Sequence, residues 1–207
     1  MPDPYHKFIN FYDLLIEPIV GGSRQQGLRL YPPLPGLLVL DVGCGTGSQL
    51  ALYQKAGCRV YGVDKSPAML ETARSKLGPS ANLTVEDASS LHFPDGMFDL
   101  VTLSLSLHEL QPAQRKAVLE ECVRVLKPKG KILIIEFNVE NFGGFLGWFR
   151  KLAVGLVESS AGKEHFSGFR QFTANGGLKS VLKDHPLTVE KQISSGNGVF
   201  AIYLIGR

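Results

Sequence analysis

The residues of this sequence that could do chemistry gather around one glycine-rich loop. In the stretch LLVLDVGCGTGSQL, residues 37–50, a run of aliphatic residues leads into an acid, Asp41, and then into Gly43, Gly45 and Gly47. An apolar run of this kind predicts a buried strand, and three glycines in five positions leave much of the following turn without Cβ atoms. We therefore expect a ligand to lie close to that main chain.

Three kinds of glycine loop could serve this purpose. A phosphate-binding P-loop needs a lysine and a hydroxyl residue after its last glycine, whereas Gly47 is followed by Ser48 and Gln49. A nicotinamide dinucleotide site favours G-x-G-x-x-G, and here Ser48 stands where the third glycine belongs. A nicotinamide-dependent oxidoreductase is thus a minor alternative. The remaining option is an adenosyl ligand without phosphates, with Asp41 near an ammonium group.

Two further acids follow the glycine loop at the ends of predicted strands. Asp64 ends the strand CRVYGV, and Asp87 ends NLTVED. At the end of the second strand, the carboxylate of Asp64 can accept hydrogen bonds from both hydroxyls of a ribose. The alternatives are a helix cap for Asp64 and an Asx-turn for Asp87. Their spacing after the glycine loop favours the ligand role for both acids.

Strands and helices alternate around these residues. Ser66, Pro67 and Gly78 predict the start and end of a helix over SPAMLETARSKLG, and QPAQRKAVLEECVRVLK predicts another helix. The alternation indicates an α/β fold with a parallel sheet and right-handed crossovers. The segments TVEKQIS and VFAIYLI around SGNG predict a terminal β-hairpin. The other predicted strands cover residues 37–42, 58–64, 82–87, 97–106 and 131–138.

The chain of 207 residues fits a single domain, 1–207. It has an N-terminal helical segment, 1–36, in which FINFYDLLIEPIV is expected to be helical. The segment 138–177 breaks the alternation and is expected to be a helical insertion that acts as a lid. Its apolar stripe could cap a pocket for an apolar acceptor, rest on a membrane surface or pack on the sheet, and we favour a packed lid. The stripe contains Phe142, Phe145, Phe149 and Leu152.

Composition narrows the possible partners. The net charge of +3 is spread along the chain without a run of lysines and arginines, so no nucleic-acid partner is expected. The three cysteines follow no metal-ligand spacing, and no metal is expected. The start MPDPYHKF lacks the regions of a signal peptide, and no apolar run reaches the roughly 20 residues of a membrane span. A cytoplasmic protein is expected, and peripheral membrane contact is not favoured.

The stretch LDVGCGTG, residues 40–47, closely resembles the first motif of the class I S-adenosylmethionine-dependent methyltransferases. The resemblance covers about Leu37 to Phe137. It implies a doubly wound, Rossmann-like, mostly parallel seven-stranded sheet with a C-terminal antiparallel hairpin and helices on both faces. It also implies methyl transfer from S-adenosylmethionine to a small, hydrophobic acceptor, with S-adenosylhomocysteine as the product. VEDASSLHFPDGMFDLV and RVLKPKGKILI are most similar to the ubiquinone and menaquinone biosynthesis type, from which the region after the fifth strand departs.

The resemblance implies a set of cofactor-binding residues. Asp87 and the amide that follows it would meet the adenine, which Lys65 and Met69 would flank, although a methionine on a helix face is more often core. Ser104 would border the methionine moiety. Tyr12 belongs to an aromatic segment that often folds over the cofactor, and packing on the core is its alternative. The full set is Asp41, Gly43, Gly45, Gly47, Asp64, Lys65, Met69, Asp87, Ala88, Ser104 and Tyr12.

Two histidines are candidates for catalysis. Methyl transfer from a sulfonium is an in-line displacement that needs chiefly orientation and exclusion of water, and a base helps when the acceptor is an oxygen or an acidic carbon. His108 in SLSLHEL follows the fourth strand, and His165 in GKEHFSGFR lies in the insertion. The alternatives are a structural role for His108 and solvent exposure for His165. A different class of function, a non-catalytic adenosyl-binding sensor or scaffold, stays open.

Overall fold

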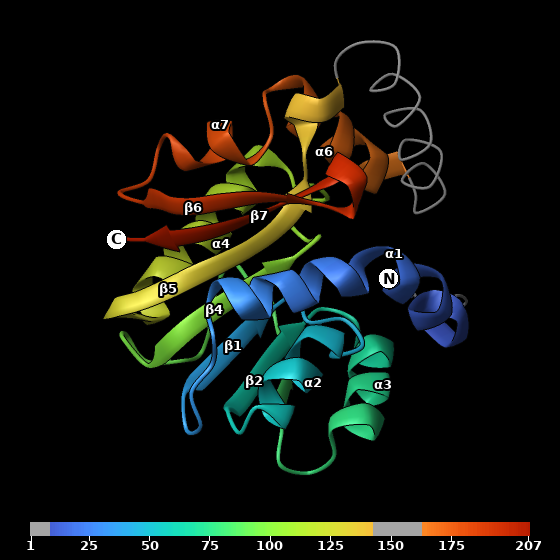
Figure 1. The fold of residues 1–207 in the computed structure, drawn as a ribbon, viewed down its shortest axis with the longest axis vertical. Helices are drawn as coiled ribbons and strands as arrows, with labels where there is room; N and C mark the ends of the chain where they lie inside the picture. The colour runs from blue at the N-terminus through green and yellow to red at the C-terminus, as the bar shows by residue number, and fades with distance from the viewer. Residues whose placement is uncertain (1–8, 143–162) are drawn as a thin grey trace.

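The computed structural model describes residues 9–142 and 163–207, with the side chains of 17–140 and 166–207 (Figure 1). The helices are α1 Ile9–Leu30, α2 Ser48–Lys55, α3 Pro67–Leu77, α4 Pro112–Val125, α6 Lys163–Ala174 and α7 Leu178–Leu182, with 3-10 turns at Val139–Phe142 and Gly196–Gly198. The strands are β1 Leu38–Val42, β2 Arg59–Asp64, β3 Asn82–Val85, β4 Phe98–Ser104, β5 Leu126–Phe137, β6 Thr188–Ser195 and β7 Phe200–Gly206.

The seven strands form one sheet in the order β3-β2-β1-β4-β5-β7-β6. The pairs from β3 to β5 are parallel, whereas β7 runs antiparallel to both β5 and β6. Helices α2 and α3 lie on one face and α4 on the other (Figure 1). This arrangement confirms the predicted Rossmann-like fold with its antiparallel hairpin. The strand order reverses between β1 and β4, and open α/β sheets bind ligands at such a switch point.

Two apolar clusters fill the space between the sheet and its helices. Val39 of β1 and Leu100 of β4 belong to the cluster under α2 and α3. Leu40 and Val101, their neighbours along the same strands, belong to the cluster under α4. All four side chains are fully buried, as expected for central parallel strands covered on both faces. The strong burial of β1 fixes the position of the loop that follows it.

Local sequence signals predicted the start of helix α3 correctly but not the start of strand β5. Ser66 caps α3 by accepting a hydrogen bond from Met69 N at 3.1 Å, which confirms the predicted start. The expected start of the fifth strand at residue 131 was wrong, because β5 begins at Leu126. Lys127 precedes Pro128, and a residue before proline avoids the helical region. The chain therefore leaves α4 directly in the extended conformation.

Helix α1 is longer than the predicted helix, which ended at Val20. It continues to Leu30, and Ser23 Oγ lies 2.8 Å from Ser195 Oγ in a buried hydrogen bond. A Cβ at Gly27 would lie 2.9 Å from the side chain of Leu133, so this part of the helix packs tightly on the sheet. The polar and glycine residues of GGSRQQG carry little apolar periodicity, which explains the short prediction.

The segment after β5 is described only in part. Helix α6 packs at the carboxyl end of the sheet, but the predicted stripe residues Phe145, Phe149 and Leu152 and the side chain of Phe142 lie outside the described residues. The lid therefore stays a prediction. In the ranges that the structure describes, no helix combines the length and apolar character needed to cross a membrane. An apolar cluster joins α6 to the sheet and α1 through Val20, Phe137, Phe169 and Phe200, with Leu105, Phe166 and Val199 against it.

Candidate functional site

The glycine loop leaves β1 in a conformation that favours glycine. Gly43, Gly45 and Gly47 have φ values of +70°, +52° and +76°, in the left-handed region that other residues seldom adopt. The amides of Gly43 and Cys44 donate to the carbonyl of Val63 at 2.9 and 3.0 Å. These bonds fix the loop against the end of β2.

The three glycines have different surroundings. A Cβ at Gly47 would lie 2.9 Å from the side chain of Leu77 and 3.2 Å from that of Ala73, so this glycine allows the loop to pack on α3. A Cβ at Gly43 would lie 3.0 Å from Cβ of Ser106, whereas nothing lies within 4 Å of the Cβ position of Gly45. Of the three glycines, Gly45 is therefore the one whose main chain has open space in which a ligand could lie. Gly47 serves packing inside the protein.

Asp64 joins the glycine loop to the start of α3. Its Oδ2 accepts a hydrogen bond from Gly45 N at 2.8 Å, and its Oδ1 accepts one from Ser66 N at 2.9 Å. The carboxylate thus braces two backbone segments, which includes the helix-start role considered as an alternative. Each carboxylate oxygen has a second lone pair, so ribose hydroxyls could still bind to Asp64.

Asp87 lies beside the end of β2. It accepts hydrogen bonds from the amide and hydroxyl of Ser89 at 2.9 and 2.7 Å, the Asx-turn considered as its alternative, and pairs with Lys65 Nζ at 2.9 Å. Burial raises the pKa of Asp87, but the bonds from Ser89 and Lys65 outweigh it and lower the pKa to about 2. The exposed carboxylate is therefore charged. Ala88 is half-buried beside it, whereas Met69 is buried.

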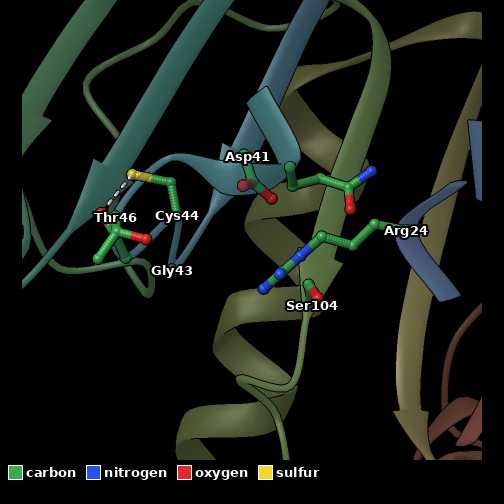
Figure 2. A pocket seen from close by; sticks show the side chains of 8 residues that line it. Arg24, Asp41, Gly43, Cys44, Thr46 and Ser104 are labelled. Atoms are coloured by element: carbon green, nitrogen blue, oxygen red, sulfur yellow. Dashed lines mark hydrogen bonds between the residues drawn. The ribbon is translucent and has the colours of Figure 1, made fainter. Parts of the chain in front are cut away.

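A small pocket, with a cavity volume of about 20 Å³, opens between the glycine loop, the end of β4 and α1. Figure 2 shows the guanidinium of Arg24 extending from α1 toward the space between Ser104 and the glycine loop. Arg24 lies beyond Val20, where the predicted helix ended, and so was not among the predicted site residues. Its ion-pair partner Glu17, two helical turns earlier, was an available signal. The lining residues are Arg24, Asp41, Gly43, Cys44, Gly45, Thr46, Gln49 and Ser104.

Asp41 places a buried carboxyl group in the wall of this pocket. Its side chain is almost fully buried, and Thr102 Oγ1 donates a hydrogen bond to it at 2.6 Å. Burial raises the pKa of Asp41 to about 7, although the hydrogen bond from Thr102 and the charge of Arg24 oppose the shift. A cation bound beside Asp41 would favour its charged form.

Several polar atoms around the pocket have no hydrogen-bond partner within the described part of the protein. They are Arg24 Nε and the hydroxyls of Ser104 and Ser106. A buried polar group without a partner costs about 1–3 kcal/mol. Donors and acceptors of this kind, together with the bare backbone of Gly45, fit a polar ligand that carries both charges, such as the amino-acid end of an adenosyl sulfonium.

His108 lies outside this pocket. It is 2% exposed, its Nδ1 lies 3.0 Å from Glu136 Oε2, and its ring packs edge-on against Phe137 at 4.8 Å between centroids. These contacts are those of the structural alternative, and a role as general base stays a prediction. The side chains of His165 and Tyr12 lie outside the described residues, so their roles also stay predictions.

Comparison with known proteins agrees with this geometry. Residues 39–130 match the methyltransferase domain family. The chain is 38% identical over 138 residues to a demethylmenaquinone methyltransferase of Renibacterium salmoninarum, covering 65% of this chain and 57% of the relative. It is 32% identical over 149 residues to a ubiquinone/menaquinone biosynthesis C-methyltransferase of Cupriavidus taiwanensis, covering 65% and 58%. The chain therefore spans little more than half the length of these relatives.

Solved structures share the whole fold. An S-adenosylmethionine-dependent methyltransferase from Aquifex aeolicus matches with a TM-score of 0.67 at 22% identity, covering 97% of both chains. A chain from the complex of the Haloferax volcanii Trm112 methyltransferase activator with a methyltransferase matches with a TM-score of 0.75 at 20% identity, covering 100% of this chain and 98% of that one. The chain thus has the Rossmann-like fold of these methyltransferase structures. Over residues 39–130 the chain is similar to the methyltransferase domain family, and its sequence is similar to quinone-biosynthesis methyltransferases.

Proposed function

We propose that this protein transfers a methyl group from S-adenosylmethionine to a small, apolar acceptor. The observation that carries the proposal is the grouping of three residues around the pocket: the bare backbone of Gly45 and the buried Asp41 line it, and the carboxylate of Asp64 is bonded to Gly45. The relatives named above, which methylate demethylmenaquinone or act in ubiquinone and menaquinone biosynthesis by their names, support the same activity.

Each part of the cofactor has a counterpart among these residues. Asp64 would accept hydrogen bonds from the ribose hydroxyls, and Asp87 with the amide of Ala88 would bind the adenine edge. Asp41 would lie near the ammonium group, and Arg24 would bind the carboxylate through its unpartnered Nε. When bound, the cofactor supplies an electrophilic methyl group, and the protein holds the acceptor in line with it and excludes water.

The surroundings of the pocket favour an apolar acceptor. Leu105 directly follows the pocket residue Ser104 and packs against the apolar cluster around Phe137, Phe169 and Phe200. These three phenylalanines are themselves buried, so the cluster gives the pocket an apolar neighbour rather than a contact surface for a ring. We infer that the acceptor resembles the demethylated naphthoquinones on which the similar proteins act by their names.

Binding and turnover can be measured separately to test this function. Calorimetric titration should show one site for S-adenosylhomocysteine and no binding of NAD. A short-chain demethylmenaquinone incubated with S-adenosylmethionine should then gain the mass of one methyl group. Binding without methylation of this quinone, or of a pool of small apolar acceptors, would favour the non-catalytic module. Binding of NAD in place of S-adenosylhomocysteine would support the oxidoreductase.

A further inference from the structure

One buried arginine joins two segments that are far apart in the sequence. Arg115 of α4 is 3% exposed, and its Nε donates to the carbonyl of Leu107 at 2.8 Å. Its Nη2 donates to the carbonyls of His108 at 3.3 Å and Gly168 at 2.7 Å. Leu107 and His108 belong to the β4–α4 loop, residues 105–111, whereas Gly168 belongs to α6. A single guanidinium thus connects the loop to the helix.

The same two segments touch through their backbones. A Cβ at Gly168 would overlap the carbonyl group of Glu109 and lie 3.0 Å from the carbonyl oxygen of His108. Glycine is therefore required at this position, although α6 is a helix in which glycine costs stability. Helix α6 rests directly on the peptide groups of the β4–α4 loop.

Glu136 holds the loop from the opposite side. This fully buried carboxylate accepts hydrogen bonds from the amides of Leu107 at 3.0 Å and His108 at 3.3 Å. Each of these two loop residues thus has its amide bound to Glu136 and its carbonyl bound to Arg115. Because burying charges costs free energy that apolar side chains would avoid, the network gives the loop a defined position rather than extra stability.

The other end of the loop meets the proposed cofactor pocket. Ser104, just before the loop, lines that pocket, and Ser106 lies against Gly43 of the glycine loop. Leu105 between them has a φ of +55°, which is uncommon for a residue other than glycine, and its amide donates to the carbonyl of Ile135 at 2.9 Å. One end of the loop therefore lies beside the pocket, and the residues that follow contact α6.

We propose that Arg115 is a positioning residue that makes α6 and the β4–α4 loop one unit, so that the helix sets the position of the loop beside the pocket. The unit itself follows from contacts of the protein alone. Its effect on methyl transfer rests on the proposed function.

Amide hydrogen exchange of the ligand-free protein tests the unit. Lysine in Arg115→Lys keeps the charge but cannot bridge several carbonyls as the planar guanidinium does. We expect the amides of Leu107, His108 and α6 to exchange together at least about tenfold faster, while those of Gly43 and Cys44 keep their wild-type rates. Lys116→Ala, a change at the exposed neighbouring position, should alter none of them. Faster exchange of α6 alone, or of the whole sheet, would overturn the proposal.

A second variant approaches the unit from the other segment. Gly168→Ala should push α6 off the loop while Arg115 is still present, and so should speed exchange at Leu107 and His108. With a short-chain demethylmenaquinone as acceptor, Arg115→Lys should lower kcat at least about tenfold and leave the Kd of S-adenosylhomocysteine within about threefold. If binding of S-adenosylhomocysteine weakened by the same factor as kcat fell, a positioning role would be contradicted. If the wild type binds no S-adenosylhomocysteine, the proposed function fails, and the exchange rates still decide whether the unit exists.

Discussion

The carboxyl group of Asp41 is the most sensitive single group of the site, because its charge depends on what lies beside it. Burial raises its pKa to about 7, from an ordinary value of 3.8. A raised pKa means that the folded state holds this proton more tightly than the unfolded chain does. The contribution of Asp41 to stability is therefore fully present below pH 3.8 and is lost as the pH rises to about 7.

This shift predicts the pH dependence of cofactor binding. Between about pH 5 and 7 the affinity for S-adenosylhomocysteine should rise with pH, by up to about tenfold per unit, because Asp41 must lose its proton to pair with the ammonium group. Calorimetric titrations in that range measure the slope. Asp41→Asn should bind more weakly and with a flatter profile. The same slope in this variant would show that another group titrates.

If Arg24 binds the carboxylate of the cofactor, its replacement should affect only ligands that carry that carboxylate. Arg24→Met should weaken binding of S-adenosylhomocysteine by about 1.5–3 kcal/mol through loss of a charged hydrogen bond, and should leave 5′-methylthioadenosine, which lacks the carboxylate, unaffected. Arg29→Met on the exposed side of the same helix is the matched control. Equal weakening for both ligands would place Arg24 away from the carboxylate.

At the scale of elements, the two glycines that flank Thr46 predict separable effects. Gly47→Ala should lower the free energy of unfolding by about 2–4 kcal/mol. The alanine would have to keep a positive φ, and its Cβ would clash with the side chains of Ala73 and Leu77. Gly45→Ala has room for the Cβ, so its cost should be about 1–2 kcal/mol of backbone strain. Denaturant unfolding measures both values.

Cofactor affinity should follow the opposite order for these two variants. A methyl group at position 45 projects into open space next to the pocket, so Gly45→Ala should weaken S-adenosylhomocysteine binding at least about tenfold. The folded fraction of Gly47→Ala should bind within about threefold of the wild type, since its side chain points at α3. A reversed order would mean that the ligand lies on the other side of the loop.

The elements that the sequence predicted well are those with local signals. Alternating apolar runs, the cap at Ser66 and the glycines of the loop define the sheet and the pocket edge, and the structure has each of them. Helix α1 past Val20 was missed because its stability comes from packing on the sheet. The role of Arg115 was also missed, since it depends on a contact with Gly168, which is distant in the sequence. Arg24 was missed because it lies beyond the end of the predicted helix.

At the scale of the whole molecule, the sheet order determines where chemistry can occur. β1 and β4 are paired neighbours at the switch point, where the glycine loop and Ser104 at the end of β4 line the pocket. Helix α1 covers this point from one face, and α6 with the apolar cluster borders it near β5. The cofactor and acceptor sides of the proposed site thus meet at Ser104. The antiparallel strand β7 pairs with β5, and its Phe200 packs in the apolar cluster with Phe137 and Phe169.

A crystal structure of the complex with S-adenosylhomocysteine tests the central claim most directly. We expect the ribose hydroxyls within hydrogen-bond distance of Asp64, the adenine beside Asp87, the main chain of Gly45 against the nucleoside, and the amino-acid end between Asp41 and Arg24. A nucleoside bound elsewhere, or Asp64 and Asp87 turned away from it, would contradict the account.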